Sequence, residues 1–312
     1  MPVSPSRKLA QRHARYIGVN ERSPWGRRAA DMGIMALKGH APIAVKSLDF
    51  GEIAVPSAAA MLAAPLRVTI SDVNTATSPT TVCSNHNGYV LLNPGTKADS
   101  GSSYQWNVAD VPSSLMQWYS GPNTTISATR DIYWGCRLAA STVTAWDGKF
   151  FMGLAITDTD GVMTETTGVL DDVADCIGFH VGETGVMTLA TRTTATGLTS
   201  GTVVAGATAP VYLGTGNIAH VAADPTTLTS AYFHDFFFHA HWGTAAATGT
   251  DCFVEGYYDG KLIWVIRNTA STLPDITSVS LYNIIEIVNG PANDQQLAVA
   301  EILNASPRYH IA

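Results

Sequence analysis

The sequence is short of charged side chains and has no long apolar run. Only 14% of its 312 residues are Asp, Glu, Lys or Arg, whereas Thr, Ser, Gly and Ala are plentiful. This composition argues against a disordered or coiled-coil chain and is typical of short strands joined by polar turns. The best membrane-span candidate, 54–66, contains Pro56 and Pro65 and falls short of the roughly 20 apolar residues that cross a bilayer. The first residues also lack the apolar core of a secretory signal, so we expect no membrane partner.

Cysteine is also scarce, because the chain has four widely spaced cysteines and no CxxC pair. Cys136, Cys176 and Cys252 each adjoin apolar, strand-like residues, which predicts buried free thiols acting as small apolar side chains. This reading favours a reducing compartment during assembly. Four cysteines also permit three disulfide pairings, which the sequence does not separate.

The motifs of several common enzyme classes are missing. The chain contains no GxxxxGKS/T, HExxH or GxSxG segment, and these segments mark phosphate-binding loops, zinc proteases and serine hydrolases. We therefore expect no cofactor and no enzymatic activity from these classes.

Charge is divided unevenly along the chain. Residues 1–46 contain nine Lys or Arg against Glu21 and Asp31, a net charge of +7. Because the whole chain carries −7, residues 47–312 carry −14. A basic segment before an acidic body is attracted to acidic surfaces, either protein or nucleic acid.

The chain divides into three parts. We expect residues 1–50 to form an extended basic arm that becomes ordered against a partner, with a plain disordered tail as the alternative. Residues 51–83 are expected to be a linker or packing segment with a short strand at 66–70, and 84–312 the folded body. The residues expected to dock the arm are Arg7, Lys8, Arg12, Arg15, Arg22, Trp25, Arg27 and Arg28.

From about residue 84 the pattern is that of many short strands at near-regular spacing, with no convincing helix. Such spacing with polar turns is typical of an antiparallel β-sandwich or jelly roll. The predicted strands lie at 88–93, 126–140, 149–157, 175–181, 186–193, 211–213, 280–290 and 296–303.

The densest aromatic segment, 232–242, is expected to be a strand with one face in the core. Side chains alternate across a strand, and the even positions are nearly all apolar, whereas the odd positions are mixed. A hairpin follows at 251–266, turning at Asp259-Gly260, because a type I′ turn needs positive φ at both central residues.

An ordered series of motifs resembles concanavalin A-like jelly-roll domains, in particular those of structural proteins of tailed-bacteriophage particles. The series runs through GLAITDTD, DCIGF, VEGYYDG, LP, NG and LAVAEI, at 153–160, 175–179, 254–260, 273–274, 289–290 and 297–302. The resemblance covers about 130 to 305. It departs from the family at Cys176, where Gly is usual, and at Ala300-Glu301, where the last strand usually has Asp. The resemblance implies two antiparallel curved sheets; virion function is a weaker implication, because the same fold hosts lectins and glycosidases.

Candidate sites are few. Glycosidases of this fold resemble one another in a Glu-x-Asp-x-Glu strand that supplies two carboxylates, and this chain has no such triplet. His239, His241 and Asp235 occupy odd positions of one predicted strand, so they lie on the same face and are the candidates for a transition-metal site. The alternative is that they are ordinary polar residues of that face. We expect no metal. The candidates for stacking on a glycan are Trp146, Tyr257 and Tyr258, although a position in the core is the favoured interpretation for these rings.

The resemblance and the charge division together predict a non-enzymatic structural protein of a phage virion, assembled in the host cytoplasm. We expect a capsid decoration or cement protein, a trimer or dimer, whose arm docks on the major capsid protein or another virion subunit. The alternative is a carbohydrate-binding, lectin-like module, free or on a tail or fibre. Nucleic acid is not the expected partner of the arm.

Overall fold

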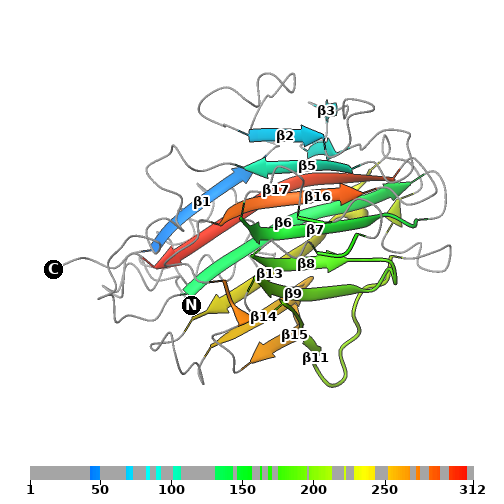
Figure 1. Ribbon diagram of the computed structural model, residues 1–312. Helices are drawn as coiled ribbons and strands as arrows, with labels where there is room; N and C mark the ends of the chain where they lie inside the picture. Colours follow the sequence, from blue (N-terminus) through cyan, green and yellow to red (C-terminus); the bar gives the residue numbers. More distant parts are fainter. Residues whose placement is uncertain are drawn as a thin grey trace, which may run out of the picture.

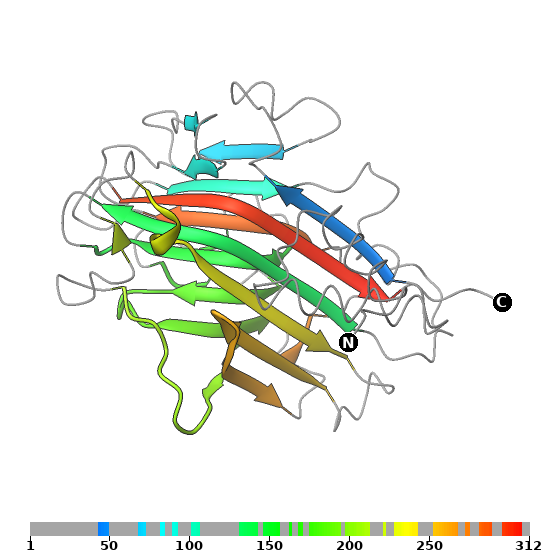
Figure 2. The same ribbon diagram turned by 180° about the vertical axis from the view of Figure 1, so that it is seen from behind.

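The chain folds into two stacked β-sheets. The computed structural model describes residues 43–49, 68–72, 82–84, 89–92, 101–106, 131–142, 146–156, 162–163, 168–170, 175–194, 197–212, 221–222, 228–242, 252–267, 272–274, 281–288 and 295–307. Figure 1 shows one sheet in front of the other, and Figure 2 shows the second sheet from its own outer side.

Sheet A has ten strands in the order β11-β15-β14-β13-β6-β17-β4-β3, with β1 beside β17 and β12 beside β6. Its strands are β1 (Ile43–Asp49), β3 (Val82–Ser84), β4 (Tyr89–Leu92), β6 (Asp131–Thr142), β11 (Thr202–Val203), β12 (Val221–Ala222), β13 (His234–His241), β14 (Phe253–Tyr258), β15 (Lys261–Arg267) and β17 (Gln295–Pro307).

Sheet B has seven strands in the order β10-β9-β8-β7-β16-β5-β2. Its strands are β2 (Val68–Asp72), β5 (Gly101–Trp106), β7 (Lys149–Ala155), β8 (Cys176–Val181), β9 (Met187–Thr193), β10 (Gly197–Ser200) and β16 (Tyr282–Val288). Among the described strands every pairing is antiparallel except the two-residue pairing of β12 with β6. The predicted all-β antiparallel sandwich is confirmed.

Within the described residues, Ser230–Tyr232 form a single 3-10 turn. No helix within the described ranges is long and apolar enough to cross a membrane.

Most predicted strands are present with small shifts of their ends. Two differ: 211–213 contributes a single bridge, between Val211 and Val186, and the last strand, β17, extends to Pro307. The pairing of β1 with β17 places 43–49, which fall within the range given to the arm, on sheet A. β2 and β3 likewise draw residues from before 84 into the sheets.

The core is centred on aromatic rings between the sheets. As parity predicted, Phe236 and Phe238 of β13 are buried on the inner face. The ring of Phe179, from sheet B, lies 5.7 Å from Phe236 and 6.2 Å from Phe238. It also lies 5.5 Å from Trp264 and 6.4 Å from Trp134. One side chain of sheet B therefore contacts four aromatic rings of sheet A.

The hairpin between β14 and β15 turns at the predicted position. Asp259 has φ of 45° and Gly260 has φ of 79°, the left-handed values that a type I′ turn requires. The Asp259 carboxylate adds two bonds, with Oδ1 accepting from the Asp235 backbone N–H at 3.0 Å and Oδ2 lying 2.8 Å from His234 Nδ1. The turn is thereby fixed to the start of β13.

Parts of both outer faces are covered by the chain itself. On sheet B, Val162, Met163 and Leu170 join a buried cluster with Phe151 and Ile284. On sheet A, the covered part lies over β4, β6 and β17, where the buried residues are Tyr89, Ala139, Ala222, Leu228 and Ala298. These coverings give the molecule apolar layers beyond its central core.

The buried cysteines match expectation. Cys136, Cys176 and Cys252 are free and buried, and Cys252 Sγ donates to the Trp242 carbonyl at 2.7 Å. Burial raises the pKa of Cys136, and it raises the pKa of Cys176 to about 12 against a partial opposing effect of Arg192. These thiols stay protonated and act as apolar side chains.

Close approach of β7 and β8 requires glycine. Gly153 and Gly178 face each other in the register, and a Cβ on Gly153 would collide with the Ile177 carbonyl oxygen and the Gly178 Cα. We expect Gly153→Ala to destabilise the protein by about 1–3 kcal/mol through overpacking, measured by urea denaturation. Thr202→Ala, at an exposed strand position, should stay within about 0.5 kcal/mol. Equal stability of the two variants would contradict this account of the β7–β8 contact.

Candidate functional site

The outer side of sheet A carries a surface of aromatic rings over β6, β13 and β14. Because Phe236, Phe238 and Ala240 point into the core, the intervening side chains of β13 point outward. The register places β6 and β14 on either side of β13. We call the resulting surface the aromatic face, made of Tyr133, Phe237, His239, His241, Phe253 and Tyr257.

The six rings form a continuous series of contacts. Phe237 lies 5.7 Å from Tyr257 and 6.2 Å from Tyr133. Tyr133 stacks on His239 at 4.4 Å. His239 meets Phe253 edge-on at 5.1 Å, and Phe253 stacks on His241 at 5.0 Å. Phe237 is only 4% exposed and forms the floor, whereas the other five rings are half-buried.

Charged groups border the aromatic face. The Arg137 guanidinium lies 3.9 Å from the Asp235 carboxylate at one side, and Arg267 lies 3.8 Å from Glu255 at the other. The Tyr257 hydroxyl donates to Glu255 Oε2 at 2.8 Å, so the orientation of this ring is fixed. Burial raises the pKa of Asp235, with the nearby Arg137 opposing and Asp259 reinforcing the rise.

The metal candidates do not converge in the described residues. His239 and His241 lie on the aromatic face as predicted, but their rings are stacked against Tyr133 and Phe253. The Asp235 carboxylate is directed toward Arg137. Within the described ranges no group of three His, Cys, Asp or Glu side chains is placed to hold a metal ion.

The three glycan candidates occupy different environments. Trp146 is 1% exposed and donates from Nε1 to the Gly148 carbonyl at 2.9 Å, so its ring belongs to the core. Tyr258 packs against the central core and stacks on His234 at 5.0 Å, and burial raises its pKa. Tyr257 alone of the three lies on the aromatic face.

Tyr133 and Phe253 also belong to the aromatic face, although sequence reasoning missed them. Tyr133 lies opposite His239 in the β6–β13 pairing, and Phe253 lies opposite His241 in the β13–β14 pairing. Alternation within each strand marks them as outward-facing. Strand order and register, which decide their neighbours, are set by distant parts of the chain.

The outer side of sheet B has a different character, because its polar groups hold the covering segment. Glu286 is fully buried, and its Oε2 accepts from the Val162 backbone N–H at 2.6 Å. Arg192 donates to the Leu170 carbonyl at 3.1 Å. His180 Nε2 lies 2.7 Å from the Gly168 carbonyl, and burial lowers the pKa of this imidazole. These contacts give Glu286 a structural role.

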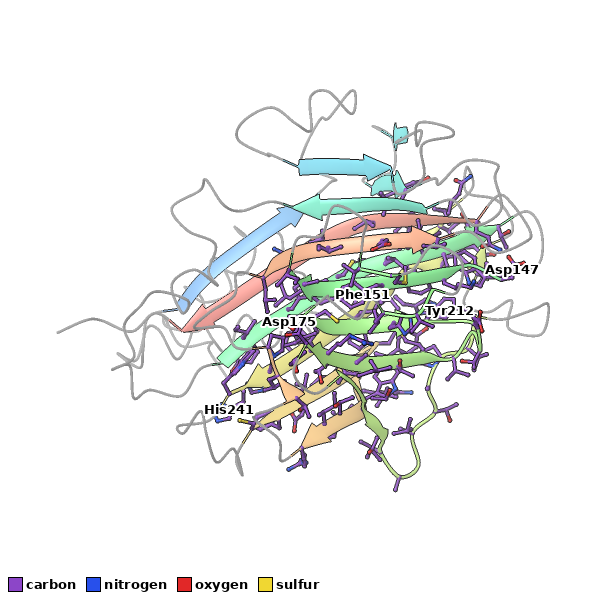
Figure 3. All side chains as sticks on the ribbon, in the orientation of Figure 1. Asp147, Phe151, Asp175, Tyr212 and His241 are labelled. Carbon is purple, nitrogen blue, oxygen red and sulfur yellow. The ribbon has the colours of Figure 1, made fainter. Side chains whose placement is uncertain are left out.

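Asp175 has a similar structural role at the end of β8. Its Oδ1 accepts from the Thr194 backbone N–H at 2.7 Å, and its backbone carbonyl accepts from Ile156 at 3.0 Å. Figure 3 shows Asp175 and Asp147 toward opposite ends of the sandwich. Asp175 and Glu286 thus each bind backbone groups that position the connecting chain.

The arm residues from Arg7 to Arg28 lie outside the described residues. The first described residues are those of β1, which pairs with the last seven residues of β17. The point at which the arm joins the body is therefore fixed at the side of sheet A.

Comparisons with known proteins give a likeness of fold. No protein-family model matches the chain, and no curated protein matches its sequence. An alginate lyase from Aplysia kurodai is similar over 84% of this chain and 98% of its own, at 10% identity and a TM-score of 0.46. An endo-1,3-beta-glucanase from Streptomyces sioyaensis is similar over 86% and 97%, at 12% identity and a TM-score of 0.44. Peanut lectin is similar over 86% and 100%, at 9% identity and a TM-score of 0.39.

These three neighbours are concanavalin A-like β-sandwiches. At such identities and TM-scores the likeness concerns the fold, and neither activity nor ligand is carried across to this chain. The resemblance to phage virion proteins stays a prediction.

The raised pKa of Asp235 predicts a pH-dependent effect of neutralising it. An ionised carboxylate with a raised folded-state pKa costs stability above that pKa, and the cost vanishes below its unfolded value of about 4. Asp235→Asn should therefore raise the Tm at pH 7 and have little effect near pH 3, measured by calorimetry. Glu183→Gln, in an exposed turn, should change the Tm at neither pH. A lower Tm for Asp235→Asn at pH 7 would mean that the contact with Arg137 outweighs burial.

Proposed function

We propose that this protein is a non-enzymatic structural component of a phage-like particle, held on its neighbour by the basic arm. The observation that carries the proposal is the division of charge, +7 over residues 1–46 against −14 over residues 47–312. A particle subunit with an acidic surface would attract the arm and repel the body. The arm would then set where the body stands on the shell.

The position of β1 supports this arrangement. Its strand pairing in the described residues is with β17, so the described body begins beside the last strand of sheet A. In the proposed arrangement, the arm joins the body at this strand and docks on a neighbouring subunit. A capsid decoration or cement protein, bound to the major capsid protein or another virion subunit, would use it in this way.

The state of the buried carboxylates supports a non-catalytic body. Glu286 and Asp175 each accept backbone hydrogen bonds that position the chain, whereas a glycosidase needs two carboxylates facing one sugar. The structural role of these two groups agrees with the missing Glu-x-Asp-x-Glu strand.

Removing the arm tests the proposal directly. A variant lacking residues 1–42, which keeps β1, should fold with an unchanged circular dichroism spectrum and lose co-sedimentation with purified particles. Replacing Arg7, Lys8, Arg12 and Arg15 by Gln should weaken co-sedimentation in the full chain and make the remainder less dependent on salt. If the truncated body decorates particles as fully as the intact chain, the arm has no docking role.

Glycan binding at the aromatic face is the second candidate function. Half-buried tyrosines with a polar tip and an apolar ring suit both faces of a sugar, and Tyr133 and Tyr257 lie on either side of Phe237. Charged groups around the rings would supply hydrogen bonds to hydroxyl groups. A lectin-like module, on a tail, on a fibre or free, would bind in this manner.

A glycan array with matched variants tests the second candidate. Tyr257→Ala should lower the signal for any bound glycan by at least tenfold, because the ring would be lost from the surface. Trp146→Phe changes an aromatic ring inside the core and should leave the bound glycans unchanged. A blank array for the intact chain would rule this candidate out.

A further inference from the structure

The side of the sandwich formed by β10 and β11 is an open sheet edge without charge. Among the described strands, β10 pairs with β9 and β11 pairs with β15, and these two short strands end their sheets. Residues 193–223 contain no Asp, Glu, Lys or Arg. In Figure 1 this edge runs past β9, β11 and β15, on the side away from β1 and β2.

Gly201 brings the two edge strands together. The chain leaves sheet B after Ser200 and enters sheet A at Thr202. A Cβ on Gly201 would lie 3.1 Å from the Trp264 Cβ and 3.3 Å from the Leu189 Cβ, so the crossing is tight. The edges of both sheets therefore form one surface.

The backbone of β10 directs some of its N–H and C=O groups toward this edge and away from β9. The Gly201 N–H donates to the Leu189 carbonyl at 2.7 Å, and bonding alternates along an antiparallel pair. Residues 197 and 199 therefore bond to β9, whereas the N–H and C=O of Leu198 and Ser200 point away from it.

The side chains at this edge do not block a further strand. Natural edges are protected by Lys, Pro or bulges, but β10 reads Gly-Leu-Thr-Ser and β11 reads Thr-Val. Leu198 and Val203 are 45% and 41% exposed, among the few large apolar side chains so exposed in the described part. Arg192, opposite Leu198, directs a guanidinium nitrogen to the Leu170 carbonyl instead.

We propose that β10 pairs antiparallel with β10 of a second copy of this chain, joining the two B sheets into one continuous sheet. Bodies that each carry −14 repel one another, so close contact between two copies is favoured where neither presents charge. The β10 edge meets this condition. Antiparallel pairing of a strand with its own copy gives a closed two-fold dimer, because each contact of one residue with another is repeated with the two copies exchanged.

Analytical ultracentrifugation of the full chain tests this pairing. The intact chain should show a concentration-dependent equilibrium between monomer and dimer. Leu198→Lys should weaken dimerisation at least tenfold, although it makes the net charge less negative and would relieve general repulsion. Ser200→Pro should weaken it similarly, because it removes an outward N–H that β9 does not use.

A matched control separates the edge from charge in general. Thr184→Lys adds the same charge at an exposed turn, at the end of β9 remote from its pairing with β10, and should not weaken dimerisation. Thermal unfolding should confirm that all three variants remain folded.

Three outcomes would overturn the proposal. The intact chain could remain a monomer at all concentrations, or it could associate equally well with either edge substitution. A dimer that forms only after residues 1–42 are removed would mean that the chain's own N-terminal segment occupies this edge. None of these outcomes bears on particle binding, so the pairing and the arm model fail independently.

Discussion

The contact of Phe179 with four aromatic rings of the opposite sheet is the constraint on which the sandwich depends. Trp134, Phe236, Phe238 and Trp264 come from β6, β13 and β15 of sheet A, and Phe179 meets all four from β8. Aromatic pairs at such distances add about 0.5–1.5 kcal/mol each beyond the apolar area they bury. This centre sets which side of every nearby strand faces inward. The opposite side chains of the same strands must then face outward.

The outward-facing side chains of the two sheets have different surroundings. On sheet B the outward residues lie under the segment that contains Met163 and Leu170, with Glu286 fixed to that cover. On sheet A the chain covers β4 and β17, while the rings over β6, β13 and β14 stay partly exposed. The aromatic face is thus a largely half-buried part of the outer side of sheet A, and the uncharged β10 edge, which we propose pairs with a second copy, is a separate surface.

The sequence correctly predicted the features that depend only on residues close together in the chain. Alternation in β13 placed Phe236 and Phe238 inside, and Asp259-Gly260 marked the hairpin turn, because both signals depend on neighbouring residues alone. It favoured the core for Trp146, which is buried there, but it missed Tyr133 and Phe253 on the aromatic face. Those positions depend on strand order and register between distant segments. The pairing of β1 with β17 was missed for the same reason, since 43–49 lie within a basic, weakly periodic stretch.

The division of charge connects this fold to its proposed role on a particle. Quantitative mass spectrometry of phage-like particles, purified from the host that carries this sequence, tests that role most directly. A structural role predicts the protein at a fixed ratio to the main shell protein after washes that remove loosely bound material. Its absence from intact particles would contradict a virion role and leave glycan binding at the aromatic face as the function to pursue.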